Sequence, residues 1–218
     1  MSRLPTRTRS SPPRIRRDSS VFLNVPFDDD YEPCFLALIA GLVGTGFSPR
    51  SVLQVPPSRD RLRRIYGLIQ SCRYSLHDLS RVELSEGLYP RFNMPFEAGL
   101  ASALAFGRER HERFLLETVR HRLLRTCSDL NGTDAEIHGG TPEGVLRSVL
   151  NLFRRPTPPP AGDLKEIWST LMATAAALKA GGDTSGIYTA ANFDNLVLMA
   201  RAVDAEQRAA RTRKGRKS

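Results

Sequence analysis

Between residues 20 and 153 the chain alternates short apolar runs with longer segments of helical spacing, about five times over. The apolar runs have the length of buried strands, and the segments between them place apolar residues three and four positions apart. Strands are predicted at 20–25, 47–55, 74–79, 114–117 and 135–138, and helices at 30–42, 59–72, 95–106, 119–127 and 141–153. This alternation predicts parallel strands with helices on both faces of the sheet.

The compact five-strand version of this plan is an α/β fold of the flavodoxin-like type, with the strand order 2-1-3-4-5. The helix boundaries carry local signals that fit it. Asp30 is expected to cap the first helix, and Thr141 is expected to cap the last. Pro142 then occupies the first position of that helix, and Glu143 lies in its first turn.

Composition divides the rest of the chain into four segments. Residues 1–19 are mostly Arg, Ser, Thr and Pro, which predicts a disordered basic tail before the α/β domain at 20–153. Residues 154–162 (RRPTPPPAG) are predicted to be a semi-rigid Pro-rich linker. A helical hairpin is expected at 163–208, with its turn at 181–186, and a second basic tail at 209–218.

Each helix of the predicted hairpin carries an apolar stripe at helical spacing. The stripes are Leu164, Ile167, Trp168 and Leu171 in the first helix, and Phe193, Leu196, Val197 and Ala200 in the second. Two helices cannot bury both stripes alone, so the hairpin must dock on the α/β body or on a second copy of the chain. The second copy is the favoured partner, which predicts a homo-oligomer.

The formal net charge of +9 belongs to the two ends of the chain. Residues 1–20 and 201–218 each carry a net +5, which leaves −1 for the residues between them. Short basic ends bind polyanions weakly and without sequence preference. The charge therefore predicts weak, non-specific polyanion binding rather than a main function in nucleic-acid recognition.

Cysteine and histidine usage indicates neither disulfides nor a metal. Cys34, Cys72 and Cys127 are odd in number and far apart, which predicts free thiols and a cytoplasmic location. The four histidines lack the spacing of metal ligands, so no metal is expected. No apolar stretch is long enough to span a membrane, and the basic N-terminus lacks the apolar segment of a secretory signal.

Three polar clusters lie where ligands bind in an open parallel sheet, at the carboxyl ends of its strands. They are Asn24–Asp28 after the first strand, His77–Arg81 after the third, and Arg91–Glu97 at the start of the next helix. Because the first and third strands flank the point where the strand order reverses, these loops are expected to converge on one crevice. The chain has no GxGxxG, GxxxxGK[ST] or GxSxG motif, which argues against a dinucleotide fingerprint, a P-loop and an α/β-hydrolase.

Four strings in this domain resemble known proteins. They are VFLNVPFD at 21–28, RYSLHDLSR at 73–81, PRFNMPFEAGL at 90–100 and SDLNGTDAEIH at 128–138. Together they resemble a group of bacterial TIR-like proteins, and FEAGLA at 96–101 resembles the E-x-G-x-A segment of nucleoside 2-deoxyribosyltransferases. The resemblance implies cleavage of the N-glycosidic bond of a nucleotide such as NAD, by hydrolysis or by transfer, in defence or stress signalling. It implies no required cofactor.

The same resemblance assigns Glu97 to the catalytic position beside the scissile bond. A carboxylate there stabilises the positive charge that builds on the sugar, or attacks the sugar as a nucleophile. The candidate substrate-binding residues are Asn24, Phe27, Asp28, His77, Asp78, Arg81, Arg91 and Asn93. Amide and carboxylate groups in this set suit sugar hydroxyls, the aromatic ring suits stacking on a base, and the arginines suit a phosphate.

Each of these assignments has a structural alternative. Glu97 complements the helix dipole if it merely lies in a first helical turn. Asp28 is suited to capping the helix, Asp78 to capping a turn, and His77 to a structural hydrogen bond. The functional alternatives are a non-catalytic nucleotide-sensing or self-assembling module of the same fold, and a nucleic-acid-associated protein that uses its basic tails.

Overall fold

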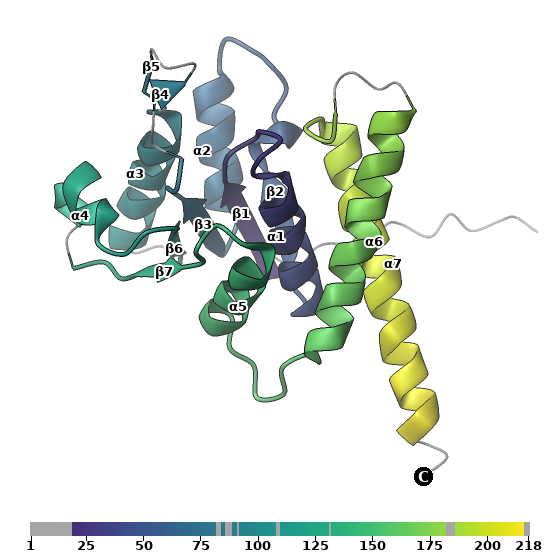
Figure 1. Cartoon of the computed structure of the whole chain (residues 1–218). Helices are drawn as coiled ribbons and strands as arrows, with labels where there is room; N and C mark the ends of the chain where they lie inside the picture. Colours follow the sequence, from purple (N-terminus) through teal and green to yellow (C-terminus); the bar gives the residue numbers. More distant parts are fainter. Residues whose placement is uncertain are drawn as a thin grey trace, which may run out of the picture.

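The structure, a computed structural model of the chain, describes residues 19–81, 84–85, 89–90, 92–107, 110–130, 132–181 and 186–215. Its core is a five-stranded sheet in which every strand pair is parallel. The strands are β1 (Ser20–Asn24), β2 (Ser48–Ser51), β3 (Tyr74–Asp78), β6 (Glu112–Glu117) and β7 (Ala135–Ile137). Their spatial order, β2-β1-β3-β6-β7, is the predicted 2-1-3-4-5 order and confirms the fold class (Figure 1).

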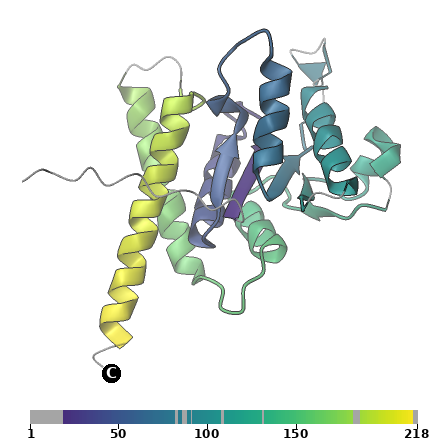
Figure 2. The same ribbon diagram turned by 180° about the vertical axis from the view of Figure 1, so that it is seen from behind.

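Helices cover both faces of this sheet. They are α1 (Glu32–Gly44) and α5 (Pro142–Leu152) on one face, and α2 (Arg61–Ser71) and α3 (Asn93–Phe106) on the other (Figures 1 and 2). A short helix, α4 (Arg122–Thr126), follows β6. The sequence patterns did not predict the small antiparallel pair β4 (Leu84–Ser85) and β5 (Tyr89–Pro90), or the 3-10 turns at Val52–Gln54 and Ser128–Leu130.

Two elements have boundaries that differ from the predicted ones, and the local backbone conformation explains each difference. The second strand ends at Ser51, because Ser51 and Gln54 form a reciprocal capping box that starts a 3-10 turn. The helix predicted from residue 119 begins only at Arg122, because His121 has a φ of 62°. A residue in this left-handed conformation cannot lie inside a right-handed helix.

The first helix also begins differently from the prediction. Asp30 does not cap α1; its carboxylate is exposed, and no side chain caps this helix. The backbone N–H of Tyr31 instead donates to Asp28 Oδ1 at 3.0 Å. Asp28 therefore closes the turn that leads from β1 into α1, which supports the structural alternative for this residue.

The start of α5 confirms its predicted cap. Thr141 has extended backbone angles, and its Oγ1 accepts the backbone N–H of Gly144 at 3.1 Å. Pro142 occupies the first position, where a helix needs no N–H donor.

Thr141→Ala is expected to lower the free energy of unfolding by about 1 kcal/mol, because the N–H of Gly144 loses its acceptor. Urea denaturation measures the change, and Thr141→Ser serves as the control because it keeps the oxygen. Equal losses in the two variants would contradict the capping assignment.

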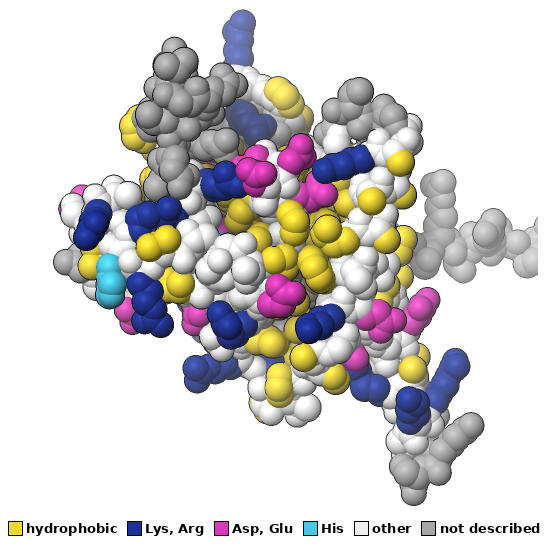
Figure 3. Space-filling model, in the orientation of Figure 1, with side chains coloured by type: hydrophobic (Ala, Val, Ile, Leu, Met, Phe, Trp, Pro, Cys, Tyr) yellow, Lys and Arg dark blue, Asp and Glu magenta, His cyan; other side chains and the backbone are white. Residues whose placement is uncertain are grey.

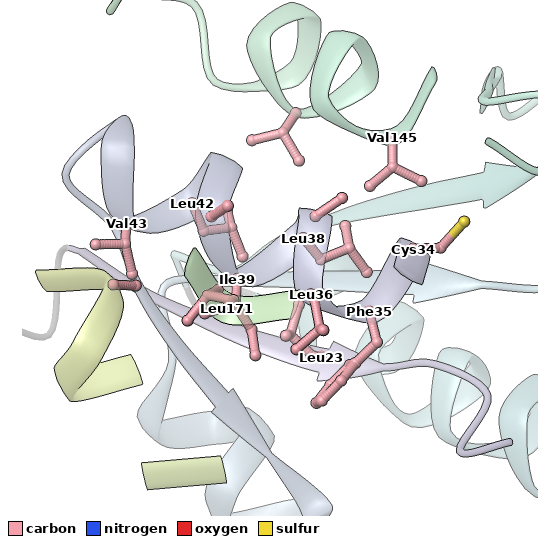
Figure 4. Close-up of a cluster of buried hydrophobic side chains, with 14 of the residues drawn as sticks. Leu23, Cys34, Phe35, Leu36, Leu38, Ile39, Leu42, Val43, Val145 and Leu171 are labelled. Carbon is pink, nitrogen blue, oxygen red and sulfur yellow. The ribbon is translucent and has the colours of Figure 1, made fainter. Parts of the chain in front are cut away.

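Helix α1 is apolar on every side, and all its residues from Cys34 to Gly44 are buried. The sheet lies beneath it, α5 lies beside it, and its outer side is covered by α6 (Ala161–Ala180) and α7 (Ala190–Gly215) (Figures 1 and 4). The approach of α6 is close, because a Cβ at Gly44 would overlap Leu164 Cδ2. A residue without a side chain at position 44 lets the two helices meet.

This packing answers the question of where the C-terminal hairpin docks. The buried stripe residues are Leu164, Ile167, Leu171, Phe193, Leu196, Val197 and Ala200. Trp168 is half-buried, and its Nε1 donates to Pro33 O at 3.0 Å. The hairpin thus docks on the α/β body of its own chain, so these stripes no longer indicate a second copy.

The chain ends differ in part from the predicted segments. Helix α6 begins at Ala161, inside the predicted linker, and α7 continues to Gly215, so most of the predicted basic tail at 209–218 is helical. Arg211 in this segment forms an ion pair with Asp163 of α6. Residues 1–18, most of the predicted turn at 181–186, and residues 216–218 lie outside the described residues.

Candidate functional site

Alternation along β3 separates two of the predicted site residues. His77 and Asp78 are consecutive in this strand, and consecutive side chains point to opposite faces of a sheet. His77 contacts Asn24 on the side of α2 and α3, whereas Asp78 contacts Tyr31 and His138 on the side of α1 and α5. The described residues do not form one crevice here: the hollow beside Asn24 and the hollow beside Asp78 are separate and share no lining residue.

Asn24 and His77 belong to a buried chain of hydrogen bonds. Asn24 Nδ2 donates to Met94 O at 2.8 Å and to His77 Nδ1 at 2.9 Å. The proton of neutral His77 is then on Nε2, 2.9 Å from Ser75 Oγ, which lies 2.8 Å from His111 Nε2. Burial, followed by neighbouring positive charge, lowers the pKa of His77 to about 3. This geometry supports the structural alternative for His77, and it shows that Asn24 anchors the first turn of α3 to β1.

The first hollow, of about 290 Å³, lies beside this anchor. Its lining residues are Val25, Pro26, Phe27, Asn93 and Met94. It brings together Phe27 and Asn93, two of the predicted substrate-binding residues. The Phe27 ring packs edge-on against Phe35, with ring centres 5.9 Å apart, and lies 5.5 Å from the ring of Tyr188. Because Tyr188 Oη also donates to Asp28 O at 2.6 Å, the C-terminal hairpin holds the loop that forms this hollow.

Glu97 lies one helical turn beyond Asn93, on the same side of α3. Its side chain is buried, and Oε2 has no hydrogen-bond partner among the residues that the structure describes. Burial raises the pKa of Glu97 to about 7, although the charge of Arg61 at the start of α2 acts in the opposite direction. A buried carboxylate oxygen without a hydrogen-bond partner is costly, and such groups are concentrated at functional sites.

Asp78 is the centre of a second buried cluster. Its carboxylate accepts hydrogen bonds from Tyr31 Oη and from the backbone N–H of Ser80 (2.9 Å), and His138 Nε2 lies 3.1 Å from Oδ2. The N–H of Gly140 donates to His138 Nδ1 at 3.2 Å, so the proton of neutral His138 is on Nε2 and faces Asp78. Burial alone would raise the pKa of Asp78, but its contacts with His138, Ser80 and Tyr31 outweigh burial and lower it.

The second hollow, of about 260 Å³, opens above this cluster. Its lining residues are Asp30, Tyr31, Cys34, Ser80, Arg81, Thr118, Arg122, His138 and Gly140. Both arginines are already paired: Arg81 lies 3.2 Å from Asp28 and 3.3 Å from Asp30, and Arg122 Nε donates to Glu117 at 2.9 Å. Charges of both signs are interspersed over this face of the molecule (Figure 3).

Because of these ion pairs, the second hollow offers few groups that could bind a ligand or react with it. Neutralised arginines hold no surplus charge for a phosphate, so the geometry does not favour the phosphate role expected of Arg81. Burial, followed by the charge of Asp78, raises the pKa of Cys34 to about 12, which keeps its thiol protonated and a poor nucleophile. Arg91, the other predicted phosphate ligand, lies outside the described residues.

Sequence reasoning missed several residues of these clusters, namely Tyr31, Glu117, Arg122 and His138. One available signal was the glycine pair before α5: Gly139 and Gly140 have φ values of 65° and 72°. They form the tight turn that returns a backbone N–H to His138. A second signal is Gly144, where a Cβ would overlap the carbonyl oxygen of His138.

Within the described residues, no three His, Cys, Asp or Glu side chains are grouped as metal ligands. No described helix is both long enough and apolar enough to cross a membrane. The chain matches no family model, no curated protein and no solved structure.

Proposed function

We propose that the chain binds a nucleotide or nucleoside in the hollow formed by Val25–Phe27 and Asn93–Met94, and that Glu97 cleaves its N-glycosidic bond. The observation that carries this proposal is the buried Glu97 carboxyl, with a pKa of about 7 and an unpartnered Oε2, one helical turn beyond the hollow. The resemblance to TIR-like proteins and deoxyribosyltransferases supports the same assignment.

The chemistry explains why a carboxylate with one unpartnered oxygen is useful here. Cleavage of an N-glycosidic bond builds positive charge on the sugar, and that charge exists in the transition state but not in the bound substrate. A carboxylate oxygen that lacks a hydrogen-bond partner in the resting protein gains an interaction only in the transition state, which is the requirement for lowering the barrier. Burial strengthens this interaction, because water does not screen it.

A pKa of about 7 also suits a change of role during the reaction. In its charged form Glu97 stabilises the sugar cation as the base departs, and when water attacks that cation Glu97 accepts the proton of the water and passes it to the departed base. The Phe27 ring supplies an apolar surface for the base, and the exposed amide of Asn93 supplies a partner for a sugar hydroxyl. Water or a second base then accepts the sugar.

Incubation of the full chain with NAD and with a panel of nucleosides and deoxynucleosides tests the proposal. We expect free base to appear in the chromatogram for at least one substrate. If a nucleotide binds in calorimetry but no base is released, the chain is the non-catalytic nucleotide-sensing module instead. Neither binding nor release would overturn both functions.

The cellular setting is part of the same proposal. The three cysteines are free thiols, which supports the cytoplasmic location expected from the sequence. A nucleotide-cleaving enzyme there fits the role in defence or stress signalling that the resemblance implies.

A further inference from the structure

Apart from the exposed Asn93 at its first position, the solvent-facing side of α3 is apolar. The exposed apolar residues recur at intervals of four and three, from the residue before the helix to its last residue, and they are Phe92, Phe96, Gly99, Ala103 and Phe106. We call this set the α3 stripe. Phe92 is 72 %, Phe96 53 % and Phe106 79 % exposed. Glu97, the one charged residue of α3, lies on the buried side.

Neighbouring helices show that this side of α3 is unusual. Helix α2 exposes Arg63 and Arg64, and α5 exposes Glu143 and Arg147. Charged outer faces of this kind are expected of helices that lie between a sheet and water. A helix that is apolar on all sides is normally covered on all sides.

Helix α1 shows how this chain covers such a helix, because α6 and α7 pack over its outer side. Helix α3 lies on the opposite side of the molecule from that hairpin (Figures 1 and 2). Among the described residues, the Arg113 guanidinium lies 5.8 Å from the centre of the Phe106 ring, but all three phenylalanines of the α3 stripe stay more than half exposed. We propose that the stripe is covered by the α3 stripe of a second copy, with the two helices antiparallel.

The order of side chains in the stripe favours a second copy over an unrelated partner. In an antiparallel pair centred on residue 101, Phe96 lies opposite the partner's Phe106, and Gly99 lies opposite the partner's Ala103. Large side chains thus flank a centre of small ones, where two helices can approach closely. Such a self-complementary surface is what a two-fold symmetric interface requires, and the four-three spacing is that of paired helices.

The exposed area sets the strength of this association. The three phenylalanines together expose about as much surface as two whole Phe side chains, roughly 300–500 Å². A standard interface buries about 800 Å² on each partner. The stripe supplies about half of that, so we expect a dimer that dissociates on dilution.

Sedimentation equilibrium of the full chain over a dilution series tests the proposal and needs no substrate. We expect a mass that approaches twice 24.2 kDa at high concentration and 24.2 kDa at low concentration. Ala103→Glu places two carboxylates in the centre of the interface and should abolish the dimer. The matched control is Leu198→Glu on α7, which adds the same charge at a position that is 60 % exposed and outside the stripe.

A second variant tests the antiparallel register. Gly99→Lys should also abolish self-association, and its fold should be kept because nothing lies within 4 Å of a Cβ at this position. Mixing the Gly99→Lys chain with the Ala103→Glu chain should restore a dimer. In each mixed pair the introduced ammonium group of one chain faces the introduced carboxylate of the other, so repulsion is replaced by attraction.

Three results would overturn the proposal. A wild-type chain of 24.2 kDa at every concentration would show that a second copy does not cover the stripe. A dimer lost in Leu198→Glu but kept in Ala103→Glu would place the interface elsewhere. Failure of the mixed variants to pair, with wild-type dimerisation intact, would exclude the antiparallel register.

Discussion

Asp78→Ala is expected to lower the free energy of unfolding by about 3–5 kcal/mol, because it removes a fully buried carboxylate that several groups share. Tyr31 Oη, the backbone N–H of Ser80 and His138 Nε2 would face a space without an acceptor. These groups come from the start of α1, the end of β3 and the end of β7, so the loss weakens three connections at once.

Urea denaturation at neutral pH measures this loss. Asp29→Ala is the matched control, since the Asp29 carboxylate is 86 % exposed and its removal should cost less than about 0.5 kcal/mol. Because folding lowers the pKa of Asp78, its contribution should persist above about pH 4 and decline as the pH falls further. Equal stability of the two variants would contradict the bracing role of Asp78.

Glu97→Gln is expected to stabilise the chain at high pH. The unfolded chain releases the Glu97 proton near pH 4.5, whereas the folded chain holds it until about pH 7. Between these values the folded state binds more protons, so the wild-type chain loses stability as the pH rises, by about 3 kcal/mol in total. Glutamine cannot ionise, and the variant escapes this loss.

The measurement is the free energy of unfolding of both chains at several pH values. The difference in favour of Glu97→Gln should be small near pH 4.5 and should grow toward about 3 kcal/mol above pH 7. Glu206→Gln, at an exposed position of α7, should show no such trend. A difference that does not change with pH would mean that the Glu97 carboxyl is not desolvated.

If Glu97→Gln is more stable than the wild-type chain, then the charged Glu97 side chain destabilises the folded protein. Proteins keep such residues where activity requires them, because stability and activity make opposing demands at active sites. This measurement therefore bears on function before any substrate is known.

Much of the fold follows from local sequence signals. The apolar runs around Phe22 and Leu76 form buried central strands, and the cap at Thr141 starts α5, because each signal acts within a few residues. The boundaries that moved depend on conformations that a hydrophobic pattern does not encode. The left-handed His121 before α4 is one, and the capping box that ends β2 is another.

The candidate site was only partly predictable. Placing Asn24 and Phe27 near the start of α3 required only the strand order, and the structure brings these segments together. Predicting that His77 and Asp78 point to opposite faces of the sheet also required the alternation of side chains along β3. The partner His138 lies 60 residues beyond Asp78, and no spacing rule connects two groups that meet only after the sheet has formed.

The partner of the C-terminal hairpin illustrates the same limit. Members of both stripes, such as Ile167 and Phe193, are buried as their helical spacing predicts. Periodicity identifies which side of a helix is buried, but it does not identify the surface that buries it. That surface is α1, whose own apolar residues are spread around the whole helix.

The most direct test of the central claim is the rate of base release by Glu97→Gln relative to the wild-type chain, on whichever substrate the wild-type chain cleaves. Circular dichroism of both chains controls for folding. We predict a rate at least about 100-fold lower in the variant, because the amide cannot supply the negative charge that the sugar cation needs. A variant that releases base at the wild-type rate would contradict the assignment of Glu97 as the catalytic residue.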